Sequence, residues 1–209
     1  MPHPLVDQLR FTRSEWVRAF EGVTRDETEQ RFGSMNSMAW LVGHLAWHEQ
    51  ISWLERAQGR TVVPEVARFG FGEPGITPAG DEAWRAWRAI TEAADPYLDT
   101  LTSDRLVAHW EVNGAPHRES IGTTLRRLTY HYWFHLGESQ AIRQMLGHAD
   151  LPVFVGQINR APYRPETAPC APATRGAAAR AISSGRRGTS RGSSISRSSS
   201  TPRECGRTA

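Results

Sequence analysis

Residues 130–147, YHYWFHLGESQAIRQMLG, lie in the longest helical pattern of the chain and carry two histidines four positions apart. Apolar residues recur at spacings of three and four along residues 120–146, and Gly147 is a natural helix end. Four residues of α-helix correspond to about 6 Å of rise and about 40° of rotation, so His131 and His135 project from one face. The pattern predicts a helix whose two imidazoles either bind a metal ion or are only polar residues of a buried surface.

Three further segments have helical spacing, and polar N-cap residues or glycines mark their ends. They are residues 4–21, 36–58 and 80–102. Pro96 should bend or restart the last of them, because proline has no backbone N–H to donate and its ring clashes within a helix.

Two connections between these segments are long. Residues 60–80 are rich in Gly and Pro and should form an irregular crossover, while residues 106–118 alternate around Asn113-Gly114, a strong signal for a tight hairpin. Four long helices with a crossover and a small hairpin describe an all-α fold, a four-helix bundle. We expect this domain to cover residues 5–166.

The charge of the chain is divided between two unlike segments. Its net charge is +3, but residues 168–209 hold eight Arg and one acid, so the preceding body is acidic. An acidic body does not suit nucleic-acid binding, which the basic segment could support only non-specifically. Because residues 167–209 contain almost no large apolar side chains, we expect a disordered Arg/Ser-rich tail.

The compartment follows from the cysteines and the apolar runs. Cys170 and Cys205 both lie in the tail, so no disulfide framework can hold the body together. The N-terminus has no signal-peptide pattern, and no stretch of 18 apolar residues suggests a membrane span. We expect a cytoplasmic protein with no membrane partner.

A second histidine pair, His44 and His48, lies on the segment 36–58. A catalytic first-row metal usually has three protein ligands, so either of these could complete a site begun by His131 and His135. Neither pair has the glutamate of an HExxH motif, which argues against a zinc protease. The remaining histidines are predicted to be surface or capping residues; they are His3, in a fraying terminus, His109, His117 and His148.

Two stretches closely resemble the DinB-like (DinB/YfiT-like) superfamily of metalloenzymes: MNSMAWLVGHLAWHE (35–49) and HYWFHLGESQAIRQMLGHADLP (131–152). The resemblance implies a bundle, often a homodimer, that binds zinc, nickel or an iron-like divalent metal through His44, His131 and His135. His48 would then line the pocket, and Glu138 occupies the place of the family's frequent Gln.

Characterised relatives include thiol-dependent transferases, in which the metal lowers the pKa of a low-molecular-weight thiol. We therefore expect a metal-dependent S-transferase that uses mycothiol or bacillithiol and acts on a small electrophile. Glu49, Glu138 and His48 are the candidates for orienting groups or for proton transfer. The alternatives are a metal-dependent hydrolase and a non-catalytic bundle that binds a ligand or acts in a stress response.

Overall fold

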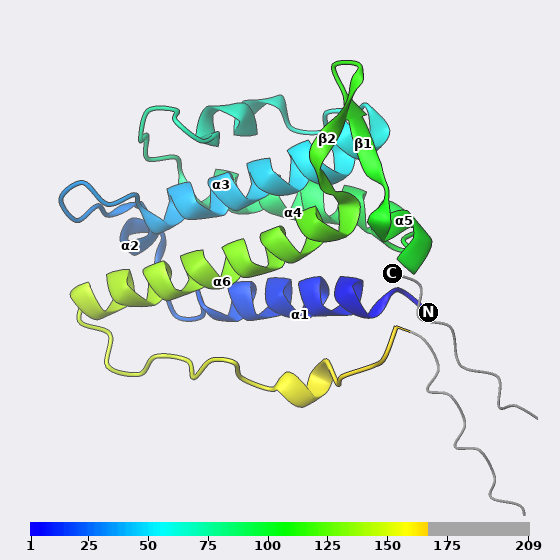
Figure 1. Cartoon of the computed structure of the whole chain (residues 1–209). Coiled ribbons are helices and arrows are strands. Elements are labelled where there is room, and N and C mark those ends of the chain that lie inside the picture. The colour runs from blue at the N-terminus through cyan, green and yellow to red at the C-terminus, as the bar shows by residue number, and fades with distance from the viewer. Residues whose placement is uncertain (167–209) are drawn as a thin grey trace, which may run out of the picture. The chain divides into compact units, whose positions relative to one another are not determined.

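The computed structural model describes residues 1–166, which are mostly helical with one two-stranded sheet (Figure 1). The predicted tail, residues 167–209, lies outside the described residues. The long helices are α1 (Pro4–Arg18), α3 (Met38–Glu49), α4 (Gly80–Leu98) and α6 (Ile121–Met145). The shorter elements are α2 (Arg25–Glu29), η1 (Gln50–Arg56), η2 (Pro64–Phe69), α5 (Ser103–Val107), β1 (His109–Val112), β2 (Ala115–Ser120) and η3 (Ile158–Arg160).

The four predicted helices are all present, but their ends differ. The side chain of Ser37 caps α3 by accepting a hydrogen bond from the backbone N–H of Trp40 at 3.2 Å. The predicted segment 36–58 continues past α3 as the π-helical stretch η1, a change that apolar periodicity does not reveal. The expected restart at Pro96 is wrong, because α4 runs through this residue and ends two positions later.

Helix α3 packs against both α4 and α6, and α1 packs against α6 (Figure 1). The Arg13 guanidinium of α1 joins α4 through an ion pair of 2.9 Å to Asp95. The largest fully buried side chains come from all four long helices and η1, and they include Trp16, Trp53 and Tyr132. The core therefore lies between the long helices, and its aromatic residues come from distant parts of the chain.

The hairpin is confirmed where the sequence predicts it. Strands β1 and β2 pair antiparallel, with Val112 opposite Ala115. Asn113 and Gly114 have φ angles of 54° and 76°, the left-handed values that a type I′ turn requires at both positions. The ring of Trp110 packs 5.8 Å from that of Trp53, which anchors the hairpin to η1.

The connection between η1 and α4 contains one short 3₁₀ helix, η2, and otherwise little regular structure, as predicted. It passes over α3 (Figure 1). A Cβ atom on Gly43 of α3 would lie 2.7 Å from the ring of Phe69 in η2. The glycine therefore permits a close approach that brings the end of η2 onto α3.

Both ends of the described chain are fixed to α1. His3 is buried, and its Nδ1 accepts a hydrogen bond from the Leu5 N–H at 3.2 Å, so the predicted frayed terminus is wrong. The segment after α6 runs back along α1 (Figure 1), where the Arg18 guanidinium donates to the carbonyl of Val153 at 2.7 Å. Among the described residues, every helix is too short or too polar to cross a membrane.

Candidate metal centre

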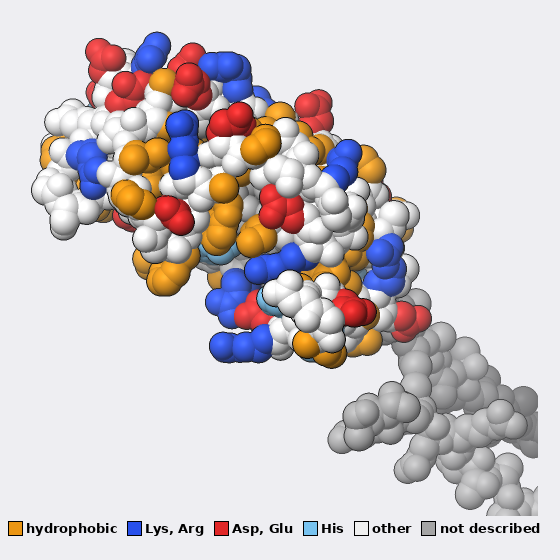
Figure 2. Space-filling view, turned by 90° about the horizontal axis from the view of Figure 1, so that it is seen from above, with side chains coloured by type: hydrophobic (Ala, Val, Ile, Leu, Met, Phe, Trp, Pro, Cys, Tyr) orange, Lys and Arg blue, Asp and Glu red, His pale blue; other side chains and the backbone are white. Residues whose placement is uncertain are grey.

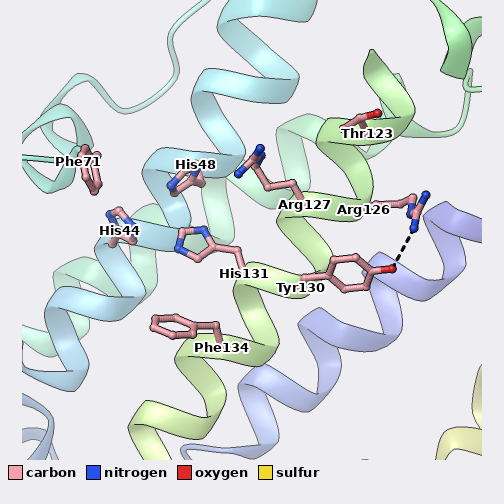
Figure 3. Close-up of a pocket in the computed structure, with 9 residues that line it drawn as sticks. All are labelled: His44, His48, Phe71, Thr123, Arg126, Arg127, Tyr130, His131 and Phe134. Atoms are coloured by element: carbon pink, nitrogen blue, oxygen red, sulfur yellow. Dashed lines mark hydrogen bonds between the residues drawn. The ribbon is translucent and has the colours of Figure 1, made fainter. Parts of the chain in front are cut away.

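Four histidines meet where α3 faces α6. His44 and His48 project from α3, while His131 and His135 project from α6. Figure 3 shows the rings of His44, His48 and His131 pointing toward one another, and one ligand nitrogen from each lies within 4.8 Å of the other two. This is close enough for the three imidazoles to share one cation.

His135 is the immediate neighbour of this group. Its Nε2 lies 2.8 Å from the Nε2 of His131, and its ring centroid is 5.3 Å from that of His44. On the other side of its ring, Nδ1 lies 2.9 Å from Oε2 of Glu138. A carboxylate behind an imidazole fixes its tautomer and orientation, which is a common arrangement around metal-binding histidines.

A backbone carbonyl holds His44. Its Nδ1 lies 2.6 Å from the carbonyl oxygen of Phe69, and its ring stacks on Trp40 with the centroids 4.6 Å apart. Since a carbonyl only accepts, Nδ1 must carry the proton and donate it, which leaves Nε2 with a free lone pair. The close contact between Gly43 and the Phe69 ring brings that carbonyl within reach.

His44, His48 and His131 are held neutral. Burial is the largest cause, and it lowers the pKa of His44 to about 4, of His131 to about 3 and of His48 to about 2. Repulsion between neighbouring imidazoles acts in the same direction. Because a neutral imidazole is the form that binds a cation, this donor set fits a divalent transition metal.

The predicted ligands and the geometric group share His44 and His131 and differ in the third member. The prediction names His135, whereas the nitrogens that lie within 4.8 Å of one another belong to His44, His131 and His48. Both candidates for the third ligand, His48 and His135, lie against His131. The ring centroids of His48 and His131 are 4.4 Å apart, and the Nε2 atoms of His135 and His131 are 2.8 Å apart. The third ligand is therefore still a prediction.

Glu49 lies apart from this centre. Its side chain is fully buried, and its two oxygens accept hydrogen bonds of 2.7 and 2.6 Å from the guanidinium of Arg13. Tyr132 donates its hydroxyl to the same carboxylate at 2.8 Å and accepts a hydrogen bond from the Trp87 indole at 2.7 Å. These contacts join α1, α3, α4 and α6, so the position of Glu49 suits a structural role better than proton transfer.

The histidine centre opens into a hollow of about 750 Å³, which we call the histidine hollow. Figure 2 shows a histidine in a recess bordered by hydrophobic and arginine side chains. Besides His44, His48 and His131, its lining comprises Phe71, Thr123, Arg126, Arg127, Tyr130 and Phe134 (Figure 3). Sequence reasoning missed these residues, although those on α6 lie three to eight positions from His131 or next to it and so share its neighbourhood.

Comparison with protein families gives one match, in which the model described as the DinB superfamily covers residues 8–139. The chain belongs to the DinB superfamily. A comparison with curated proteins gave no match. The part that matches the DinB superfamily contains all four clustered histidines, so the candidate metal centre belongs to the family domain. Membership is consistent with a metal-binding enzyme.

Proposed function

We propose that this DinB-superfamily protein is an enzyme that depends on a divalent metal ion held by His44, His131 and His135, with His48 as the competing third ligand. The observation that carries the proposal is the convergence of neutral imidazoles at the base of an open hollow. Three histidines would leave a coordination position for water or substrate. Zinc, nickel and iron all accept imidazole ligands.

The reaction that we propose is thiol-dependent S-transfer to a small electrophile, with mycothiol or bacillithiol as the thiol. A bound divalent cation would lower the pKa of a thiol or a water molecule placed beside it. The chain itself would supply the positioning: Glu138 orients His135, and the aromatic side chains of Phe71, Tyr130 and Phe134 line the space above the histidines. Metal-dependent hydrolysis and non-catalytic ligand binding are the alternative functions.

Metal analysis of the purified protein tests the proposal. We expect about one equivalent of metal per chain, lost in His131→Ala and in His135→Ala but retained in His109→Ala, whose side chain lies on the hairpin. In His48→Ala we expect metal to remain bound, with affinity lowered about tenfold. If metal is instead lost in His48→Ala and retained in His135→Ala, the third ligand is His48. Less than about a tenth of an equivalent, unchanged by His131→Ala, would exclude a metal enzyme.

The type of reaction is tested by incubating the metal-loaded protein with a thiol and an electrophilic probe such as monochlorobimane. Thiol consumption that exceeds the rate of the His131→Ala variant supports S-transfer. A stoichiometric metal without any thiol consumption favours hydrolysis or ligand binding instead.

We also propose that α1, α3, α4 and α6 form the four-helix bundle expected for the family. The packing of α3 on α4 and α6, of α1 on α6, and the ion pair between α1 and α4 support this arrangement. A homodimer and a cytoplasmic location stay predictions, and light scattering in solution measures the first of them.

A further inference from the structure

A second hollow, of about 370 Å³, adjoins the histidine hollow and shares His48 and Arg127 with it. Its lining includes three arginines, Arg56, Arg118 and Arg127, against one carboxylate, Glu119. We call it the arginine hollow. Its excess of positive charge lies directly beside the proposed reaction centre.

The arginines of this hollow are not equivalent. Arg127 is neutralised by Glu119, to which its Nε donates at 2.9 Å. Arg56, at the end of η1, is half-buried, and within residues 1–166 it makes neither a hydrogen bond nor an ion pair. Burial lowers the pKa of Arg56 and outweighs the attraction of Glu119 and Glu55, although a guanidinium still keeps its charge at neutral pH. A partly desolvated cation without a partner is costly unless an anion joins it.

A hydroxyl group at the wall of the same hollow also lacks a partner. Thr124 on α6 is 4% exposed, and its Oγ1 has no hydrogen-bond partner among the described residues. A buried hydroxyl normally finds a partner. The oxygen itself is covered by protein atoms, so the side chain would have to turn before this hydroxyl could donate to an anion in the hollow.

The opposite side of the histidine centre has the reverse charge. A hollow of about 640 Å³ is lined there by His44, His131 and His135 together with two carboxylates, Glu73 and Glu138. The charged side chains that line the two hollows therefore differ in sign. An anionic group of a ligand above the histidines is favoured toward Arg56 over Glu73 and Glu138.

We propose that the arginine hollow binds the anionic group, a carboxylate or a phosphate, of the small-molecule substrate whose reacting part lies at the histidines. Arg56 supplies the positive charge and a guanidinium that can hold two oxygens, whereas the charge of Arg127 is already balanced by Glu119. The apolar part of the substrate lies against the aromatic lining of the histidine hollow. This assignment rests on the proposed function, because it takes the histidine centre as the place of reaction.

The test is an NMR titration of the full-length ¹⁵N-labelled chain with benzoate, phenyl phosphate and neutral benzamide, first as purified and then in EDTA. The side-chain Nε–H signal of Arg56, identified by its loss in Arg56→Gln, reports on the hollow. We expect that signal to shift with benzoate or phenyl phosphate and not with benzamide, both with and without EDTA. If benzoate binds more tightly than phenyl phosphate, the anionic group of the substrate is a carboxylate; the reverse order indicates a phosphate.

Two matched variants distinguish specific binding in the arginine hollow from non-specific attraction of anions to the protein. Arg56→Gln should weaken binding of the preferred anion by at least about tenfold, the effect of losing a charge-assisted hydrogen bond. Arg85→Gln removes the same charge from an exposed position of α4, and it should change the affinity for that anion by less than about twofold. Equal weakening in both variants, or equal binding of benzamide, would overturn the proposal. Because EDTA removes any metal, a failure of the metal centre appears in metal analysis and not in this titration.

Discussion

At the scale of single residues, the environment of each histidine matters more than its spacing. The spacing of the two pairs permits metal binding, but it is burial that keeps His44, His48 and His131 neutral well below pH 6.5. In the unfolded chain the same imidazoles would titrate near pH 6.5. Folding without metal therefore becomes sensitive to acid.

The first prediction concerns this sensitivity. Because the folded pKa of His48 is lowered to about 2, the unfolded state binds more protons below pH 6.5, and stability falls as the pH drops from there. Thermal unfolding in EDTA at pH 7.5 and pH 5 measures the loss. His48→Gln should reduce this loss of stability by up to about 2 kcal/mol, which corresponds to the one and a half pH units between the unfolded pKa of 6.5 and pH 5. His109→Gln is the control, and an identical pH slope in both variants would contradict the prediction.

At the scale of elements, the position of His44 on α3 depends on η2, the 3₁₀ helix of the connection between η1 and α4. The carbonyl that orients His44 belongs to Phe69 of η2, and η2 reaches α3 because Gly43 has no side chain. Nothing in the spacing of the histidines reveals this support. It is a property of two elements in contact.

The second prediction tests that contact. Gly43→Ala places a Cβ 2.7 Å from the Phe69 ring, so the ring and its carbonyl must move away from His44. We expect metal affinity to fall about tenfold, as for other losses of a ligand's hydrogen-bond partner. Gly137→Ala on α6 is the matched control, because a Cβ there meets nothing within 4 Å. Equal metal affinity in the two variants, measured by competition with a chelator, would show that the contact is unimportant.

The third prediction concerns the buried network that joins α1, α3 and α6. Glu49→Gln removes the charge that compensates Arg13, whose guanidinium is buried, and should lower the free energy of unfolding by about 3 kcal/mol. Metal content per folded chain should not change, because Glu49 contacts Arg13 and Tyr132 and not the histidines.

Urea unfolding and metal analysis check the two halves of this prediction. The double variant Arg13→Met with Glu49→Leu should recover part of the lost stability, since an apolar pair needs no charge compensation. Loss of metal without loss of stability would instead assign Glu49 to the chemistry of the centre.

At the scale of the whole molecule, the described residues contain a complete core. Its buried hydrophobic side chains run from Val6 on α1 to Ala161 near the end of the segment that lies along α1. The four clustered histidines lie inside the same body. The composition of residues 168–209, with eight Arg and few large apolar residues, offers little that could add to such a core.

The fourth prediction follows from this division. A chain that ends at Glu166 should keep the melting temperature within about 2 °C and the metal content of the full-length protein, because it keeps every core residue named above. Calorimetry and metal analysis of both forms make the comparison. A large fall in either value would mean that residues 167–209 contribute to the fold.

The local features of this protein can be predicted from its sequence alone. Apolar periodicity placed the four long helices, Asn113-Gly114 placed the hairpin, and the residues around His44 and His131 indicated the family. These signals are readable because helix and turn formation depend on residues a few positions apart. The restart expected at Pro96 does not occur, and His3, expected to fray, is buried as the N-cap of α1 and contacts Ser103.

Which distant side chains meet became known only from the folded arrangement of the helices. Glu49 could be a group of the reaction centre until folding brought it to Arg13, and Arg56 gave no signal until η1 placed it beside Arg127 and Thr124. The position of each side chain depends on how far its helix is rotated about its axis and on which helix it faces. Packing of the whole core sets both quantities, and no short stretch of sequence contains them.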